Sequence, residues 1–431
     1  MGKIKEFIQS LQVVVSPLTA FFAGTLLTCC AYGLLSSTLA LRLAENGVST
    51  FASGIILAAY YLGYIFASLS SYKIINRVGH IRAFGAYLSV LSALVLLHAL
   101  SFNPIFWGVL RLLEGYCLGS ALMCLESWLN TRSNNKNRGV LMSLYMLTTY
   151  LGAGTGQLML NIPDGSGVIV YILVSILYSI ALVPISLTAL PSPDISVHKD
   201  ISLVYLYKIS PIGVVSCIVS GVFVGSFYTL GAIYTHEIGL DLSQTALFMS
   251  FGIFGGMLAQ LPVGRLSDKF DRRFVLMWAC GLLFFVAPWI HVLIDNGRWE
   301  LIAAAAILGS GTFILYPISV SHVNDLISDS ERIHASGMLI LLQSIGMIAG
   351  PIGISFLMQH FGAMWFLLSF SVASGAFVLF ALRHIFFHPE LHYVNVTPTD
   401  PVPVSPTHAF SNLAQNTSLV DKAKELFVNK H

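Results

Sequence analysis

Twelve uninterrupted apolar runs, each long enough to cross a bilayer, constrain this chain more than any other feature of its sequence. The hydrocarbon core of a bilayer is about 30 Å thick, so a spanning helix needs about 20 apolar residues. The runs lack the period-two alternation of barrel strands, and only 10% of the residues are charged, against about 25% in a soluble domain. The sequence therefore predicts an all-α membrane protein with twelve transmembrane helices. They cover residues 18–41, 51–72, 83–101, 104–128, 139–162, 168–189, 211–235, 243–263, 274–294, 299–322, 335–359 and 363–386.

The distribution of lysine and arginine predicts how these helices are oriented. With the N-terminus in the cytoplasm, the inner segments hold 19 of these residues and the outer loops hold two, Arg42 and Arg298. Cytoplasmic loops carry the excess of Lys and Arg in membrane proteins, so both termini are expected in the cytoplasm. The net charge of +2 then reflects these loops, and no nucleic-acid partner is expected.

A repeated segment indicates that the bundle is duplicated. Residues 264–273 (GRLSDKFDRR) lie between two apolar runs, and a related segment, 72–82 (YKIINRVGHIR), lies 192 positions earlier. We expect both segments to be short, basic, turn-forming loops. Two further pairs of segments match at offsets of 194 and 198 residues. Such repeats are typical of transporters built from two halves. We expect a cytoplasmic N-terminus (1–17), a six-helix bundle (18–189), a cytoplasmic linker (190–210), a second six-helix bundle (211–386) and a disordered, proline-rich cytoplasmic tail (387–431).

Three sets of residues resemble known signatures. Residues 264–273 resemble Gly-x-x-x-Asp-Arg-x-Gly-Arg-Arg, the motif that the major facilitator superfamily carries between helices two and three and again between helices eight and nine. Residues 111–115 (RLLEG) are similar to that family's Arg-x-x-x-Gly motif, and residues 350–353 (GPIG) to its glycine-rich motif. Residues 126–130 (ESWLN) and 137–139 (NRG) resemble a largely unassigned bacterial branch related to drug and sugar carriers. The resemblance implies a transporter of the bacterial inner membrane.

In this family the two signature segments imply a cytoplasmic gate that latches the halves together when the inner side is closed. The first copy departs from the family motif at Tyr72 and Asn76, and the second departs at Lys269 and Asp271. Asp268 keeps the family's carboxylate whereas Asn76 does not, so we expect the second copy to be the stronger latch. The expected gate residues are Asn76, Arg77, Arg82, Gly264, Asp268, Lys269, Arg272 and Arg273.

Arg111 is a charged residue inside the fourth predicted helix. Such a residue costs about 2.5–3.5 kcal/mol on insertion scales and normally faces the bundle interior or a wet cavity. Glu114 follows at a spacing of three, within reach of an ion pair. One interpretation is that Arg111 binds an anionic group or couples protons with Glu114. The alternative is a structural pair that braces the bundle.

Three further ionisable residues are candidates for substrate binding or proton coupling. Glu126, near the inner end of the same helix, could take up and release a proton, or could form an ion pair with Arg132 or Arg138. His322 and Asp325 end the tenth predicted helix and could form a second titrating pair. Their alternative role is to cap that helix at the membrane interface.

The family resemblance places the central pathway along helices one, four, seven and ten. Polar and aromatic residues there and on helices five and eleven are candidates to line a cavity, although each aromatic could instead serve helix packing. As a group they favour an amphipathic organic substrate over an inorganic ion. They are Tyr32, Ser36, Tyr145, Tyr150, Gln157, Tyr228, Thr229, Tyr316, Ser319 and Gln343.

The favoured function is secondary transport of a small organic solute by alternating access, with protons as the expected coupling ion and a monomer as the working unit; efflux and uptake both fit the sequence. An ATP-driven pump would need a GxxxxGK[ST] motif, which the chain lacks. A membrane-embedded enzyme or a non-transporting sensor is the alternative. All six cysteines lie in apolar runs and none forms a CxxC pair, so no metal site or cofactor is expected.

Overall fold

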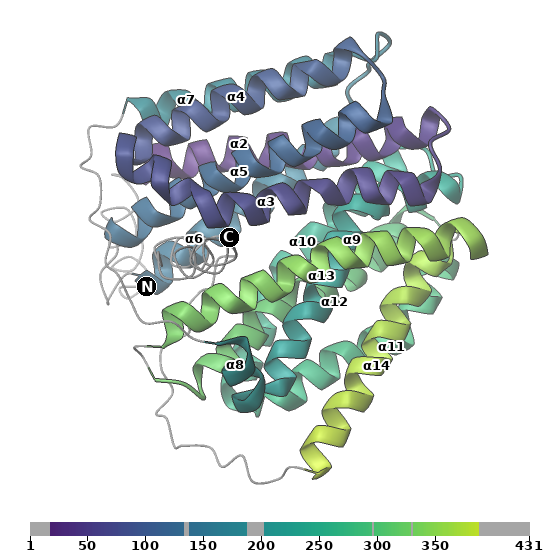
Figure 1. Cartoon of the computed structure of the whole chain (residues 1–431). Helices are drawn as coiled ribbons and strands as arrows, with labels where there is room; N and C mark the ends of the chain where they lie inside the picture. Colours follow the sequence, from purple (N-terminus) through teal and green to yellow (C-terminus); the bar gives the residue numbers. More distant parts are fainter. Residues whose placement is uncertain (1–17, 133–137, 188–201, 295–296, 329–330, 388–431) are drawn as a thin grey trace, which may run out of the picture.

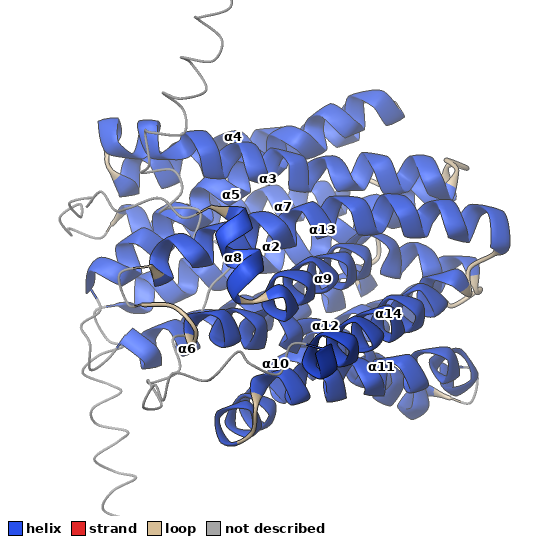
Figure 2. Cartoon of the chain, turned by 60° about the horizontal axis from the view of Figure 1, so that its bottom comes forward, coloured by secondary structure: helices blue, strands red, loops and turns tan. Residues whose placement is uncertain are grey.

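The computed structural model describes residues 18–132, 138–187, 202–294, 297–328 and 331–387. The predicted N-terminal segment, most of the linker and nearly all of the tail lie outside these residues. The described part of the chain consists of helices and short connections without a strand (Figure 2), which confirms the all-α prediction. Eleven of its helices are long and apolar enough to cross a membrane.

Six long helices form the first group in the chain. They are α2 (Thr19–Glu45), α3 (Thr50–Val78), α4 (His80–Leu100), α5 (Pro104–Arg132), α6 (Arg138–Leu158) and α7 (Ile169–Ser186). A 3-10 turn, η2 (Met159–Asn161), follows α6, and a short helix, α8 (Leu203–Ile209), occupies the end of the predicted linker. The second group consists of α9 (Pro211–Glu237), α10 (Leu242–Lys269), α11 (Arg272–Ile294), α12 (Arg298–Asn324), α13 (Arg332–Phe361) and α14 (Trp365–Phe387).

Helix α6 is the predicted span that is absent from the eleven candidate membrane helices. Its sequence interrupts the apolar residues with Thr148, Thr149, Gly152, Gly154 and Gln157, which lowers its hydropathy. The helix packs against α2 and α10, and its opposite face, with Leu147 and Leu151, is exposed. Gly152, Gly154 and Gln157 are buried on the side that meets those helices, where small and polar residues are tolerated. The count of twelve membrane helices stays a prediction.

The two groups of helices lie on opposite sides of the molecule and repeat one another's packing (Figure 1). In the first group α3 packs against α5, α2 against α6 and α4 against α7. In the second group the corresponding pairs are α10 with α12, α9 with α13 and α11 with α14. Contacts between the groups come mainly from α3 with α13, α6 with α10 and α2 with α9.

Glycines allow the closest helix pairs to approach. A Cβ atom at Gly115 would lie 1.9 Å from the carbonyl oxygen of Tyr60, and one at Gly309 would lie 1.7 Å from that of Gly252. Both distances are shorter than any side chain tolerates, so these positions require glycine. The first holds α5 against α3, and it thereby fixes the position of Arg111 one turn away on α5.

The signature segments, which we expected to be turn-forming loops, are mostly helical. Helix α10 continues through Lys269, so only Phe270 and Asp271 separate it from α11. Helix α3 continues through Val78, and Gly79 alone separates it from α4, with a φ of 89°. We expected loops because the apolar runs end before these polar segments begin. A polar sequence marks exposure to water, but it does not end the backbone hydrogen bonds of a helix.

The two groups of helices converge at one end of the bundle. Thr50 donates to Glu237 Oε1 at 2.5 Å, the backbone N–H of Phe51 donates to Gln359 Oε1 at 3.0 Å, and the Phe51 and Phe356 rings lie 5.7 Å apart. Figure 1 shows this end at the right, whereas the groups diverge toward the left. Contacts between the groups therefore close one end of their interface.

Candidate functional site

A cavity of about 170 Å³ lies between the two groups of helices. Its described wall comes from α2, α3, α5 and α6 of the first group and from α9, α12 and α13 of the second. Eight of the 21 wall residues are tyrosines. The wall consists of Cys29, Tyr32, Tyr60, Tyr61, Tyr64, Leu118, Leu122, Tyr145, Met146, Thr149, Tyr150, Ala153, Val224, Tyr228, Phe313, Tyr316, Pro317, Ile340, Gln343, Ser344 and Met347.

Most of the residues expected from the sequence to line a cavity belong to this wall. They are Tyr32, Tyr145, Tyr150, Tyr228, Tyr316 and Gln343. Gln157 does not belong to it: its side chain is buried and donates to Ser36 Oγ at 3.5 Å. Ser36, Thr229 and Ser319 donate to carbonyl oxygens of their own helices, so they too serve packing. The sequence analysis selected residues by the helix that carries them, and this does not specify which face of that helix meets the cavity.

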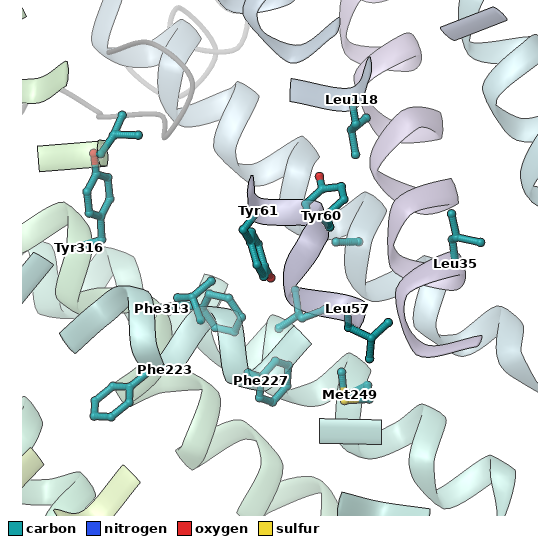
Figure 3. Close-up of a cluster of buried hydrophobic side chains, with 14 of the residues drawn as sticks. Leu35, Leu57, Tyr60, Tyr61, Leu118, Phe223, Phe227, Met249, Phe313 and Tyr316 are labelled. Carbon is teal, nitrogen blue, oxygen red and sulfur yellow. The ribbon is translucent and has the colours of Figure 1, made fainter. Parts of the chain in front are cut away.

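Three wall tyrosines were missed by the sequence reasoning. Tyr60, Tyr61 and Tyr64 lie on α3, the second helix, whereas the family resemblance directed attention to helices one, four, seven and ten. A signal was present, because the run YYLGY places three phenols within five residues of an apolar span. Figure 3 shows Tyr60 and Tyr61 on one group of helices and Phe313 and Tyr316 on the other.

The aromatic rings of the wall form contacts that continue from one group of helices to the other. Tyr32 stacks on Tyr60 with ring centroids 5.4 Å apart, and its ring lies 5.5 Å from that of Tyr228 on α9. Phe313 on α12 lies 5.8 Å from Tyr228 and 5.7 Å from Tyr150 on α6. These separations lie in the range of favourable aromatic pairs. The aromatic surface therefore depends on both groups of helices.

Arg111 and Glu114 form a buried ion pair directly behind this wall. Arg111 Nη1 donates to Glu114 Oε2 at 3.0 Å, and the two side chains are 3% and 1% exposed. The guanidinium carbon of Arg111 lies 4.5 Å from the centroid of the Tyr60 ring, a cation–π arrangement. Neither charged residue belongs to the described cavity wall.

His98 on α4 is a third member of this buried group, and the sequence reasoning did not identify it. His98 Nδ1 lies 3.3 Å from Glu114 Oε1, and the imidazole is fully buried. Its ring stacks on Tyr171 of α7 at 6.1 Å and meets the Trp107 edge at 5.0 Å. The sequence does not indicate a role for a lone histidine near the end of an apolar span, because its partner comes from another helix.

Glu126 lies on the same side of α5 as the wall residues Leu118 and Leu122, at successive spacings of four. The residue is completely buried, and the Tyr145 hydroxyl donates a hydrogen bond to its carboxyl group. Tyr145 itself lines the cavity. The side chains of the alternative partners, Arg132 and Arg138, are not among the described ones.

His322 and Asp325 have different neighbours in the described structure. Asp325 accepts from Arg272 Nε at 2.6 Å, which ties the end of α12 to the start of α11. His322 is buried and lies beside a small space shared with Ser210 and Arg273. The two residues are three positions apart, yet the geometry gives each of them a separate environment.

The two expected gate arginines of the second copy pair with carboxylates of the same segment. Arg272 Nη1 lies 3.1 Å from Asp268 Oδ1, and Arg273 Nη2 lies 2.7 Å from Asp271 Oδ2. These pairs lie within the second group of helices, so they do not join the two groups in this conformation. Around Gly264 the space is open. The side chains of Asn76, Arg77, Arg82 and Lys269 are exposed.

Within the described residues, no three His, Cys, Asp or Glu side chains are grouped closely enough to hold a metal ion. All six cysteines are buried free thiols. The chemistry available at the cavity is therefore that of phenol hydroxyls, aromatic faces, amides and the ionisable residues behind them.

Comparisons with known proteins match nearly the whole chain. The model of the Major Facilitator Superfamily matches residues 21–258 and residues 212–429. The uncharacterized MFS-type transporter YcaD of Escherichia fergusonii is 26% identical over 376 residues, which cover 87% of this chain and 97% of that protein. The Shigella flexneri YcaD is 27% identical over 384 residues, with the same coverage of 87% and 97%.

Solved structures share the fold at low sequence identity. A mutant of the nucleoside transporter NupG has a TM-score of 0.73 and 13% identity, with 85% of this chain and 99% of that chain covered. A bacterial homologue of the human lysosomal transporter Spinster, in an inward-facing and occupied conformation, has a TM-score of 0.67 and 14% identity over 85% and 96%. The E. coli fucose:proton symporter FucP has a TM-score of 0.54 and 14% identity over 85% and 99%.

Proposed function

Because this chain belongs to the major facilitator superfamily, we propose that it moves a small organic solute across the bacterial inner membrane by alternating access. The observation that carries this proposal is the cavity whose wall comes from both groups of helices. A site shared between two halves can be opened to either side when one half rocks against the other. The YcaD relatives are described as MFS-type transporters, which supports transport and leaves the solute open.

We further propose twelve membrane helices in two halves with the boundaries expected from the sequence, both termini in the cytoplasm, and a monomer as the working unit. The excess of lysine and arginine on one side supports this orientation. The end closed by the contacts of Thr50 and Phe51 then faces outward, and the cavity is accessible from the cytoplasm. In this inward-open state the ion pairs of the second signature segment lie within its own group of helices, which agrees with a latch that engages only when the inner side closes.

Proton coupling is the second part of the proposal. Glu114 lies between a fixed cation, Arg111, and a histidine that can gain or lose a proton, His98. Glu126 is held by Tyr145, a residue of the cavity wall, so a proton on its carboxyl group would weaken that contact. One of the structural neighbours, FucP, is a fucose:proton symporter, which supports the choice of ion.

Distances between spin labels in the purified protein test alternating access without knowledge of the substrate. One pair, Arg77→Cys with Lys269→Cys, spans the two groups at the inner end, and a second pair, Glu45→Cys with Asp241→Cys, spans them at the outer end. All four positions are exposed, and the native cysteines are buried. A matched control pair, Arg77→Cys with Glu45→Cys, lies within the first group.

Alternating access predicts two populations whose inner and outer distances change in opposite directions between pH 5 and pH 8, while the control distance stays constant. A single distance for each pair at both pH values, in liposomes and in detergent, would overturn the proposal of a rocking transporter.

A further inference from the structure

The cavity wall carries no ionised side chain among its described residues. Two charged residues contact the wall from outside it: the Arg111 guanidinium lies 4.5 Å from the Tyr60 ring, and the Glu126 carboxyl group is hydrogen-bonded to Tyr145. Arg111 is already paired with Glu114 at 3.0 Å. A charged solute entering this space would lose its hydration without gaining a direct counter-charge, which disfavours ions of either sign.

Aromatic rings dominate the surface that remains. Tyrosine supplies eight of the 21 wall residues, and Phe313 connects the tyrosines of both groups of helices. Stacking on such rings favours a flat, unsaturated solute over a saturated one of equal size, because both faces of a planar ring find partners. Cation–π attraction could favour a cation, but it is smaller than the cost of removing a cation from water without a counter-charge.

Two polar groups in the wall can orient such a solute. The Tyr316 hydroxyl is buried and has no hydrogen-bond partner among the described residues. The Gln343 side chain lines the same space and makes one long contact, from Nε2 to Ser220 Oγ at 3.4 Å. A buried hydroxyl without a partner is costly, and a ligand that supplies a carbonyl, ring nitrogen or hydroxyl would remove that cost.

The size of the cavity limits the ligand. Its volume of about 170 Å³ is close to that of an engineered cavity of about 150 Å³ that holds one benzene ring. Resting on the transport function proposed above, we propose that the cavity selects an uncharged planar aromatic solute of one or two rings with at least one hydrogen-bonding group. Phe313 and the wall tyrosines stack on it, and Tyr316 hydrogen-bonds its polar group.

Four probes of nearly equal size separate charge from planarity. Benzamide is neutral and aromatic, benzoate is its anion analogue, benzamidinium is its cation analogue, and cyclohexanecarboxamide is neutral but not flat. Binding to the purified full-length protein is measured by ligand-observed NMR, with dissociation constants taken from titrations. Benzamide is expected to bind at least tenfold more tightly than each of the other three.

Two substitutions with matched controls place the bound probe in the cavity. Tyr316→Phe is expected to weaken benzamide binding about threefold to tenfold, since it removes one hydrogen bond. Phe313→Leu is expected to weaken it about fivefold through lost stacking. The controls are Tyr87→Phe and Phe223→Leu, which alter buried aromatic residues outside the wall and should leave binding within twofold. Figure 3 shows Phe313 and Phe223 together.

Each result bears on the proposal separately from the transport function. Equal or tighter binding of an ion or of cyclohexanecarboxamide would overturn the solute class, and so would a failure of all four probes to bind. Unchanged benzamide binding in both cavity variants would overturn the site. Spin-label distances that alternate while no probe binds would leave the transport proposal standing. Benzamide binding without alternating distances would overturn transport and leave the site in place.

Discussion

The buried pair of Arg111 and Glu114 predicts an asymmetric response to substitution. Glu114→Gln keeps the shape of the side chain but removes its negative charge, and it leaves the guanidinium of Arg111 buried against Tyr60. Both charged side chains are no more than 3% exposed, so solvent cannot replace the lost partner. Removing one partner of such a pair costs about 3–5 kcal/mol. We expect Glu114→Gln to lower the free energy of unfolding by that amount.

Arg111→Met should cost less than Glu114→Gln. His98 Nδ1 lies 3.3 Å from the other oxygen of Glu114 and can take up a proton, which supplies a replacement cation. The double variant Arg111→Met/Glu114→Gln leaves neither charge behind. We therefore expect it to be more stable than Glu114→Gln alone, by about 1–3 kcal/mol in a double-mutant cycle.

The assay is reversible unfolding of the purified variants in mixed micelles of increasing SDS content, followed by circular dichroism. A matched control is the exposed pair Arg42 and Glu45, which has the same spacing of three, an N–O distance of 3.4 Å, and side chains 31% and 46% exposed. Glu45→Gln breaks this pair alone and should cost at most about 1 kcal/mol, because Arg42 keeps its contact with Asp164 at 3.5 Å. If the losses of the two single variants simply add in the buried double variant, the reasoning about an uncompensated charge is wrong.

Two more predictions concern helix contacts. Gly115→Val should greatly reduce the yield of folded protein in size-exclusion chromatography, because a Cβ there would lie 1.9 Å from the Tyr60 carbonyl. The control is Gly108→Val on the same helix, where the space is open and the yield should match that of the parent. Equal yields of the two variants would contradict the packing argument. Thr50→Val removes the 2.5 Å contact with Glu237 and should increase the outward-open population about twofold to tenfold. The distances of the outer spin-label pair measure that population. An unchanged population would show that this contact does not hold the closed end.

The membrane helices could be predicted from the sequence because hydrocarbon imposes a nearly one-dimensional rule, namely an apolar run of sufficient length. The same rule explains why residues 264–269 were mistaken for a loop: polarity reports exposure to water, and α10 continues into that water as a helix. It also explains why α6 falls outside the eleven candidate membrane helices, because the glycines and the glutamine on its buried face lower its hydropathy.

The site could be predicted only in part. The spacing of Arg111 and Glu114 along one helix predicted their contact, since residues three apart share a face of the helix. No such local relation links Glu114 to His98, or Tyr32 to Tyr228, because each of these contacts joins different helices. Gln157 was assigned to the cavity on its helix alone, and the face it presents turned out to meet α2. Contacts between helices depend on rotation about the helix axis, which composition does not specify.

The ring of the wall residue Tyr60 lies 4.5 Å from the Arg111 guanidinium, and Arg111 Nε has no hydrogen-bond partner within the described residues. The rejection of anions would then depend on one phenol ring and could be reversed by a single change. Tyr60→Ala would uncover a guanidinium with a spare donor and turn a neutral cavity into a receptor for carboxylates. Divergence at this one position would allow descendants of a common ancestor to exchange one class of solute for another while the ion pair and the helix packing stay the same.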